Sequence, residues 1–431
     1  MKFIACASAL FLLFSAQSVI AGGSVVTIKQ SPDGQFTLLR DGQPYFIKGA
    51  GGHTHLDVLR DIGGNSIRTW SADALEEKVD GKPLLDRAQE LGLSVAVGLW
   101  LKHQRHGFDY SNEKTVADQR DEIRAAIKKY KDHPAVLVWG VGNEMEGPAS
   151  DGSDARVWKE VNVLAGIVKE EDTNHPVMTV IAGAGDTKVK GVVTYCTNVD
   201  ILGVNAYGSA TGAGAAVKKC GWKKTFILTE FGLPGFWEAR KTGWGAPIEP
   251  SSQQKAASYY ATQSRVAEEN AATCLGTYAF VWGQKQECTA TWFGMFLETG
   301  EKLPQVDALA YAWNKKWPDN RCPKIVRFES KLKETTVKPG ETFDASVEAT
   351  DPNGDSLTYE WSVIAESTAH SEGGDAEAKP DAFPETIIEQ GHSEARIRVP
   401  EKTGGYRLFI TVRDGKGAAS CDNIPFRVGQ Y

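Results

Sequence analysis

Two glutamates, Glu144 and Glu230, are the residues of this sequence that are best placed to do chemistry. Each comes at the end of an apolar run, 135–140 and 226–230, where an uncompensated charge is unfavourable. Two carboxyl groups that face one cavity, one ionised and one kept protonated, can cleave a glycosidic bond. This hypothesis rests on the joint placement of the two glutamates at strand ends. The short motifs around them, Asn-Glu at 143–144 and Glu-Phe-Gly at 230–232, are not specific by themselves. The alternative is that both glutamates form structural ion pairs, with Arg68 and lysines as partners.

The elements that would position these glutamates are strands of a barrel. From residue 25 to 317, apolar strand-like runs alternate with amphipathic helical stretches, and several runs lack the polar alternation of a half-exposed strand. We expect eight strands at 45–49, 65–70, 93–100, 135–140, 177–181, 201–205, 226–230 and 275–282. Eight such units in about 300 residues predict an α/β fold of the (β/α)8 TIM-barrel type.

A doubly wound open sheet is the alternative fold, and it usually carries a glycine-rich phosphate loop after its first strand. The segment 49–53 follows the first expected strand, but it lacks the third glycine of that motif. The barrel is therefore favoured. In a barrel, functional side chains gather just past the carboxyl ends of the strands, which places Glu144 and Glu230 across the mouth from each other.

With these residues in place, the chain resembles a retaining glycoside hydrolase of clan A over residues 25–317. In that clan strand four ends in Asn-Glu, matched by Asn143 and Glu144, and strand seven ends in a nucleophilic glutamate, matched by Glu230. At family level the openings of strands one and two are similar to families 2, 5 and 72. The combination of a barrel with an immunoglobulin-like module resembles the family 158 β-1,3-glucanases.

The resemblance implies a double displacement with net retention. Glu230 would attack the anomeric carbon, and Glu144 would protonate the leaving oxygen and then activate water. The two carboxyl groups would lie about 5–5.5 Å apart. Arg68 would keep Glu230 ionised and Tyr207 would hold it in position by a hydrogen bond.

The resemblance also implies residues that bind the sugar. Asn143 would bond the sugar 2-hydroxyl, and Trp282 would form the floor of the subsite next to the cleaved bond. His103 is similar to an active-site histidine that many clan members place after strand three, although His106 is equally close. Trp237 lies in a Gly/Pro-rich loop after strand seven and is a candidate stacking platform.

The substrate we expect is a β-linked polysaccharide or oligosaccharide, with a β-glucan, and endo action on a β-1,3-glucan, as the best guess. Other functions stay open: a transglycosylase of the same clan, a non-catalytic carbohydrate-binding protein, or a metal-dependent barrel hydrolase. His53 and His55 are candidate metal ligands without a third ligand in view. We expect neither a cofactor nor a metal ion.

The character of the sequence changes after residue 321. Short alternating strands separated by turn signals predict a small all-β, immunoglobulin-like or PKD-like sandwich over 322–431. Within it, 366–384 is polar, acidic and without periodicity, which predicts a long mobile loop. The run from Asp351 to Asp355 resembles part of a calcium loop, but an Asx-rich turn fits it better. The barrel domain would span 22–321.

The remaining expectations concern compartment and partners. Residues 1–21 have a lysine, a short apolar run and small residues before Ala21, as in a signal peptide of a secreted protein. Of the 7 cysteines six lie beyond that segment, which allows disulfides, and Cys322 and Cys421 are a candidate pair. A net charge of −7 and the lack of a long apolar run argue against nucleic-acid binding and membrane insertion. We expect a monomer.

Overall fold

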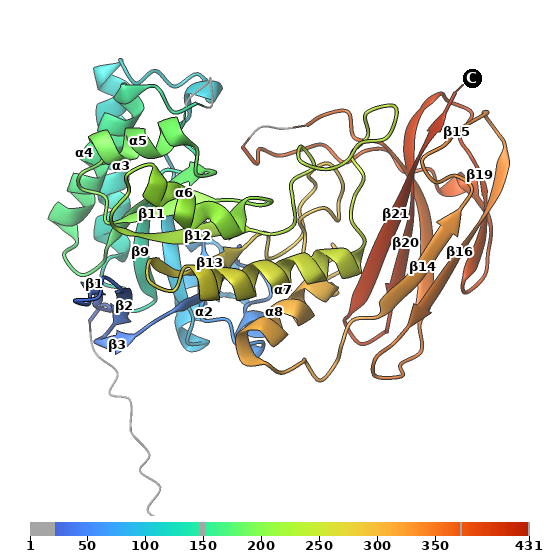
Figure 1. Cartoon of the computed structure of the whole chain (residues 1–431), viewed down its shortest axis with the longest axis horizontal. Coiled ribbons are helices and arrows are strands. Elements are labelled where there is room, and N and C mark those ends of the chain that lie inside the picture. Colours follow the sequence, from blue (N-terminus) through green and yellow to red (C-terminus); the bar gives the residue numbers. More distant parts are fainter. Residues whose placement is uncertain (1–21, 147–150, 371–372, 430–431) are drawn as a thin grey trace, which may run out of the picture.

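The computed structural model describes residues 22–146, 151–370 and 373–429, and the signal peptide predicted for 1–21 lies outside them. Eight parallel strands close into a barrel in the order β10-β11-β12-β13-β4-β5-β8-β9 (Figure 1). They are β4 (Ile47–Gly51), β5 (Ser66–Arg68), β8 (Ser94–Leu99), β9 (Val136–Val141), β10 (Val177–Ala182), β11 (Ile201–Asn205), β12 (Thr225–Phe231) and β13 (Cys274–Ala279). The predicted TIM barrel, with its eight strands, is confirmed.

Helices follow the strands and cover the outside of the barrel. They are α1 (Leu56–Asp61), α2 (Leu84–Glu90), α3 (Glu113–Tyr130), α4 (Ala155–Glu171), α5 (Asp186–Tyr195), α6 (Ala213–Lys219), α7 (Ser252–Glu269) and α8 (Pro304–Asn314). Local signals begin the two longest helices: the Asn112 side chain caps α3, and Ser251 and Gln254 form a capping box at α7.

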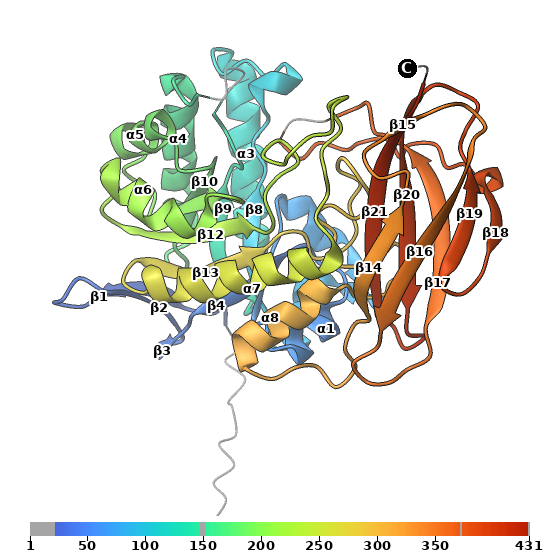
Figure 2. The ribbon, with the colours of Figure 1, turned by 45° about the vertical axis from the view of Figure 1, so that its right-hand side comes forward.

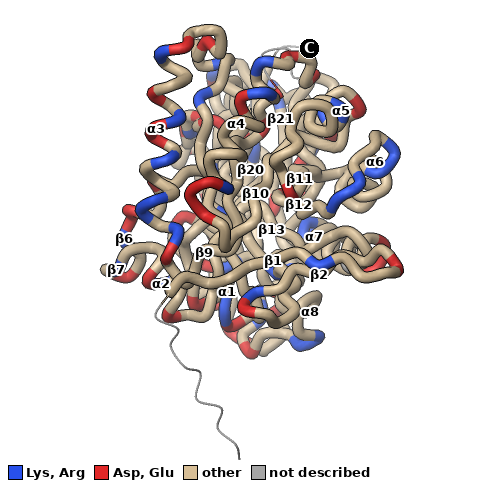
Figure 3. The backbone as a smooth tube through the Cα atoms, turned by 90° about the vertical axis from the view of Figure 1, so that its left-hand side faces the viewer, with Lys and Arg blue, Asp and Glu red and all other residues tan. Residues whose placement is uncertain are grey.

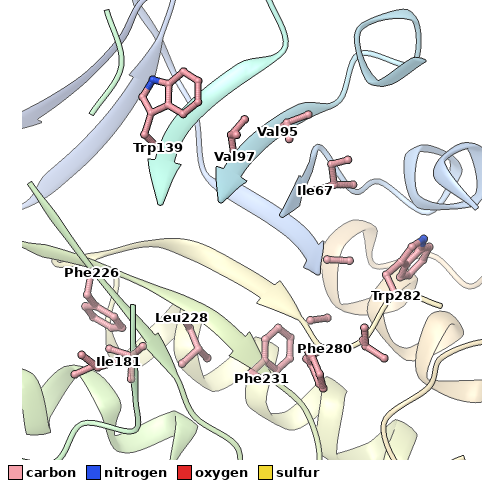
Figure 4. Close-up of a cluster of buried hydrophobic side chains, with 14 of the residues drawn as sticks. Ile67, Val95, Val97, Trp139, Ile181, Phe226, Leu228, Phe231, Phe280 and Trp282 are labelled. Atoms are coloured by element: carbon pink, nitrogen blue, oxygen red, sulfur yellow. The ribbon is translucent and has the colours of Figure 1, made fainter. Parts of the chain in front are cut away.

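The barrel has two apolar layers because alternate side chains of each strand point to opposite sides. Large side chains on the outer side form one core with side chains of the helices. Figure 4 shows three of them, Val97, Trp139 and Leu228, projecting from their strands. At Gly98 an added Cβ would lie 2.3 Å from the backbone of Trp70, so only glycine lets the loop after β5 approach β8.

A small antiparallel sheet that the sequence reading did not separate covers the amino-terminal end of the barrel. It consists of β1 (Val26–Gln30), β2 (Phe36–Arg40) and β3 (Gln43–Pro44). Val26 and Leu38 pack against inner barrel side chains such as Ile227. This end is thus filled with apolar contacts, and the opposite end remains for a site.

The chain after the barrel forms a β domain of two four-stranded sheets. One sheet contains β14 (Lys324–Ser330), β16 (Thr342–Thr350), β19 (Glu394–Arg398) and β18 (Ile387–Gln390). The other contains β15 (Thr336–Val337), β21 (Ala419–Val428), β20 (Gly404–Arg413) and β17 (Thr358–Ala365). Both sheets contribute to one core around Phe328, Trp361 and Phe426, as expected for a sandwich. The short elements are the hairpin β6 (Lys78–Val79)–β7 (Lys82–Pro83) and the 3-10 turns at 72–76, 104–106, 210–212 and 384–386.

Buried polar contacts join the β domain to the barrel, and Figure 2 shows β21 and β14 beside α7. Arg407 of β20 is 2% exposed, and its Nη2 donates to the carbonyl of Pro247 and to Glu366 at 2.6 Å each. Its Nη1 donates to Asn423, whose amide nitrogen donates to Glu249 of the barrel. A guanidinium buried this deeply needs all of these partners, so it fixes the two domains against each other.

The predicted disulfides are wrong for the six cysteines that the structure describes, since all of them are free thiols. Cys322 and Cys421 are buried, and their sulfurs lie near a carbonyl of Lys302 and the hydroxyl of Thr411 instead of each other. Burial raises the pKa of the Cys421 thiol to about 11, and it also raises the pKa of Cys322. Both positions are therefore packing residues.

Figure 3 shows acidic and basic residues interspersed along the tube, most clearly on α3. Within the described ranges, no helix combines the length and apolar character needed to cross a membrane.

We predict that Arg407→Met destabilises the protein by about 3 kcal/mol or more, because Glu366 would stay buried without its partner. Arg396→Met is the matched control, since Arg396 forms an exposed pair with Asp344 that should contribute below about 1 kcal/mol. Chemical unfolding of both variants measures the two free energies. Equal losses in the two variants would contradict the structural role of Arg407.

Candidate active site

A cavity of about 800 Å³ opens at the carboxyl ends of the barrel strands. Its aromatic walls are formed by Trp70, Trp100, Tyr207, Phe236, Trp237 and Phe280. Its other polar lining side chains are Asn143, Glu144, Asn205, Ser209, Glu230, Glu238, Lys285, Glu287 and Asp375. Both predicted catalytic glutamates therefore face the same space, with flat apolar faces around them.

Glu230, in β12, is 4% exposed and is held by three donors. Its Oε1 accepts from Arg68 Nη1 and from the Trp70 indole, each at 2.9 Å. Its Oε2 accepts from the Tyr207 hydroxyl at 2.7 Å. Donors on both oxygens fix the plane of the carboxylate. Burial and the neighbouring Glu230 raise the pKa of Tyr207, so the phenol keeps the proton that it donates.

Glu144 follows β9 in a different setting. Its backbone has a φ of 53°, a left-handed conformation that is uncommon for a residue other than glycine, and its amide donates to the Val180 carbonyl at 2.9 Å. Its Oε1 accepts from the Asn205 amide at 2.7 Å. Burial, then the charges of Glu230 and Glu146, raise the pKa of Glu144 to about 7. This carboxyl group can therefore hold a proton at neutral pH.

Asn143 connects the two glutamates. Its Oδ1 accepts from Arg68 Nη2 at 2.6 Å and from the Asn205 amide at 3.1 Å. Because its oxygen is occupied in this way, the amide nitrogen is the atom left to donate to a molecule in the cavity. Arg68 thus bonds both Glu230 and Asn143, although it is buried behind the cavity wall and does not line it.

Glu146, two residues after Glu144, is a buried neighbour of the site and no part of the cavity wall. It is 5% exposed, accepts from the backbone amide of Ala182 and lies 3.7 Å from Lys188. It does not line the cavity. Its effect on the site is electrostatic, because its charge opposes a second charge on Glu144.

The structure corrects two predicted sugar-binding residues and places a third as expected. Trp282 is 1% exposed, packs against Phe296 and does not line the cavity, where Phe280 takes its place. His103 is 3% exposed and lies behind Trp100, with its Nδ1 bonded to Arg105. Burial lowers its pKa to about 4. Both residues follow strand ends, which predicts side chains that face the cavity. In the structure both side chains instead pack behind the cavity wall.

Trp237 lies where the sequence predicted, on the cavity wall and 53% exposed. Its ring contacts Tyr207 edge to face, with centroids 5.7 Å apart. A large exposed indole beside the glutamates can stack on a sugar ring.

Sequence reasoning missed several residues of the site. Asn205 ends an apolar strand, and Asn143 follows another. This shared position at a strand end is the sequence signal that could have identified Asn205 as a site residue. Trp70 lines the cavity, and its indole nitrogen donates to Glu230. Asp375 belongs to the β domain, and nothing in the local sequence announces its place on the cavity wall.

The candidate metal ligands of the sequence do not come together. His53 bonds Glu77, and His55 stacks on Phe296. Among the described residues, one group could hold a cation, formed by Asp351, Asp355 and Asp414 in the β domain. It does not line the cavity, and Asp351 accepts from the amides of Asn353 and Asp355, as the predicted Asx-rich turn requires.

Comparisons with known proteins match this geometry. Residues 85–233 fit the family model described as "Glycosyl hydrolases family 2, TIM barrel domain". A β-glucuronidase from Streptococcus agalactiae is 27% identical over 261 residues, which are 51% of this chain and 41% of the relative. A β-galactosidase from Bacteroides ovatus is 29% identical over 111 residues, 26% of this chain and 12% of the relative. The chain thus covers less than half the length of these relatives.

The structure of a β-glucuronidase from Bacteroides uniformis superposes with a TM-score of 0.51 at 14% identity. It covers 94% of this chain and 48% of that one, and it supports the fold alone. Together the sequence matches support a glycoside hydrolase with a barrel of clan A. They point to family 2, one of the three families with similar strand openings, and not to family 158.

We predict that Glu146→Gln lowers the pKa of Glu144 below its value of about 7, because the variant removes a neighbouring charge. The amide oxygen of glutamine can still accept from Ala182. Titration of the side-chain carboxyl carbons by NMR measures the shift. Glu122→Gln, at a side chain that is 61% exposed, is the control and should leave Glu144 unchanged. An unaltered pKa in Glu146→Gln would show that the Glu146 charge has no effect on Glu144.

Proposed function

We propose that this chain is a retaining β-glycoside hydrolase in which Glu230 is the nucleophile and Glu144 the general acid and base. The observation that carries the proposal is the contrast between two carboxyl groups of one cavity. Glu230 is held by three hydrogen-bond donors, whereas burial raises the pKa of Glu144 to about 7. Paired carboxyls with opposed environments are the equipment of this reaction.

In the first step a Glu230 oxygen attacks the anomeric carbon while Glu144 transfers its proton to the leaving oxygen. The bond between the anomeric carbon and that oxygen breaks, and a glycosyl ester forms on Glu230. As the ester forms, Glu230 loses negative charge, and this charge moves onto Glu144. Asn205, which donates to Glu144, can stabilise the carboxylate that results.

In the second step Glu144 removes a proton from water, and the water oxygen attacks the anomeric carbon. Glu230 leaves as a carboxylate, into the hydrogen bonds from Arg68 and Tyr207 that held it at the start. Two inversions give net retention. Asn143 lines the cavity, and its amide nitrogen can donate to a sugar hydroxyl in the transition state.

The substrate class that we propose is a β-linked hexose glycoside. The relatives are named for β-glucuronides and β-galactosides, which are both β-linked hexosides. The expected action on a β-glucan, and endo action on a β-1,3-glucan in particular, receives no support from these relatives. Aromatic faces such as Trp237 and Trp100 favour a pyranose ring without selecting its hydroxyl pattern.

We predict that Glu230→Gln and Glu144→Gln each reduce kcat by a factor of about 1,000 or more, because one removes the nucleophile and the other removes the general base that activates water in the second step. Release of nitrophenol from nitrophenyl β-hexosides measures this loss, and proton NMR of the first product tests retention. Glu122→Gln is the control and should retain activity. Full activity of Glu230→Gln, or an inverted first product, would contradict the mechanism.

The pH profile should report the proton on Glu144. Because the acid form is the reactive one, kcat/KM is expected to fall as pH rises through about 7, where Glu144 loses its proton. Substrates whose leaving groups need no protonation should lose less rate in kcat over the same range. A basic limb that lies beyond pH 9 for every substrate would argue against Glu144 as the acid.

We also propose that the protein is exported. Support comes from Lys2, the apolar run 3–14 and the small residues that precede Ala21. Expression of the whole chain in a bacterial host should give an exported product that begins at Gly22, as amino-terminal sequencing would show. Retention of the uncleaved chain in the cytoplasm would contradict this.

A further inference from the structure

We propose that a loop of the β domain completes the substrate cavity, and that its Asp375, together with Glu287 and Glu238, selects sugars that carry no carboxylate. The sugar bound there is neutral or cationic, not a uronic acid. This inference rests on the proposed function, since it names the substrate class of the same cavity. It also separates this chain from the β-glucuronidases that it resembles in sequence.

The loop runs from the end of β17 to β18, and Figure 1 shows it leaving the β domain towards the barrel. Its residues Gly373, Gly374 and Asp375 line the cavity together with the two candidate catalytic glutamates. Far from the mobile segment that its polarity predicted, this part of the loop is bound to the barrel. The β domain thus contributes a wall of the site.

The barrel anchors the loop from two sides. On one side Arg105 donates to Asp375 Oδ1 at 3.2 Å, and His106 lies 2.8 Å from Asp375 Oδ2. On the other, Lys285 donates to the Gly374 carbonyl at 2.9 Å, and the amide of Cys288 donates to a carboxylate oxygen of Glu377 at 2.7 Å.

Gly373 permits the close approach on the Arg105 side. A Cβ there would lie 2.8 Å from the Arg105 guanidinium, and its φ of 61° suits glycine. The anchoring contacts and this glycine together define where Asp375 is placed.

The charges of the finished cavity are unbalanced. Its ionisable lining side chains are the carboxyl groups of Glu144, Glu230, Glu238, Glu287 and Asp375 and the amine of Lys285. Even with a proton on Glu144, four acidic groups stand against one basic group. Lys285 already donates to Glu287 at 2.5 Å as well as to the loop. Behind the wall, Arg105 pairs with Asp375, and Arg68 pairs with Glu230.

In the described part of the chain, each cation at this cavity is therefore occupied by a carboxylate. An incoming carboxylate would find no unpaired cation and would lie near like charges in a partly enclosed space, which is unfavourable.

Hydroxyl and ammonium groups meet the opposite situation. Carboxylate oxygens accept hydrogen bonds from both, and these charge-assisted bonds are stronger than neutral ones. Glu238 already accepts from the amides of Gly208 and Gly235, which fixes its carboxylate at the wall. With Trp237 beside it, this wall offers an apolar ring face and acceptors to one sugar.

The test measures dissociation constants of thioglycosides, which the proposed reaction cleaves poorly. Quenching of tryptophan fluorescence reports binding, because Trp70, Trp100 and Trp237 line the cavity. Phenyl 1-thio-β-D-glucoside is compared with its uronide, and the galactoside with its uronide. Phenyl 2-amino-2-deoxy-1-thio-β-D-glucoside is the cationic sugar in the same comparison. We expect each uronide to bind at least tenfold more weakly than its neutral partner. Equal or tighter binding of either uronide overturns the inference, and so does failure of every thioglycoside to bind.

Two variants test the residues named. Asp375→Asn and Glu287→Gln should each reduce the ratio of the dissociation constants of uronide and neutral sugar at least threefold. Glu287→Gln also removes the carboxylate that pairs with Lys285. Asp381→Asn is the control, because Asp381 is an exposed residue of the same loop that does not line the cavity. If this ratio of dissociation constants is unchanged in both variants, or falls equally in the control, the role assigned to the loop is overturned.

Turnover separates this inference from the proposed function. Hydrolysis of nitrophenyl glycosides with a preference for the glucuronide would overturn the inference and leave the proposed hydrolase intact. Selective binding of neutral or cationic thioglycosides, without turnover of any nitrophenyl glycoside, would support the inference on selectivity and overturn the hydrolase.

Discussion

The arrangement of the site depends on the buried guanidinium of Arg68. A charge at 2% exposure is tolerated only when its donors are satisfied, and here they reach Glu230, Asn143 and the Thr229 carbonyl. These partners lie on or just after β9 and β12, while Arg68 ends β5. One side chain therefore ties three strands of the barrel together at the level of the cavity floor and sets the orientation of both a carboxylate and an amide.

From this constraint the two glutamates acquire different properties although their residue type is the same. Glu230 lies where the guanidinium, an indole and a phenol converge, and all three donate hydrogen bonds to its carboxylate. Glu144, the residue after Asn143, has one amide donor and two acidic neighbours. Burial and these neighbouring charges raise its pKa and so favour the neutral form. The division into nucleophile and acid follows from these surroundings, which is a general route to paired carboxyls with opposed roles.

The β domain is part of the same arrangement. Arg407 fixes it to the barrel by buried hydrogen bonds, and its loop then reaches the cavity wall at Asp375. The contacts of Asp375 with Arg105 and His106 join residues 270 and 269 positions apart in the chain. The low hydrophobicity of the loop was a correct observation, but it does not imply motion, because the partners that hold the loop are charged side chains of the other domain.

The sequence by itself determined the barrel, the two-sheet domain and the two strand-end glutamates, because strand periodicity and buried charges are local patterns. The resemblance to clan A also implied the positions of Tyr207 and Arg68 beside Glu230, where the structure has them. Only the tertiary structure decided which way strand-end side chains turn: Trp282 and His103 pack behind the wall, while Phe280 and Asn205 face the cavity. It also decided that the six cysteines in the described ranges are unpaired and that Asp375 joins the site. These outcomes depend on distances between segments remote in sequence, which local spacing does not encode.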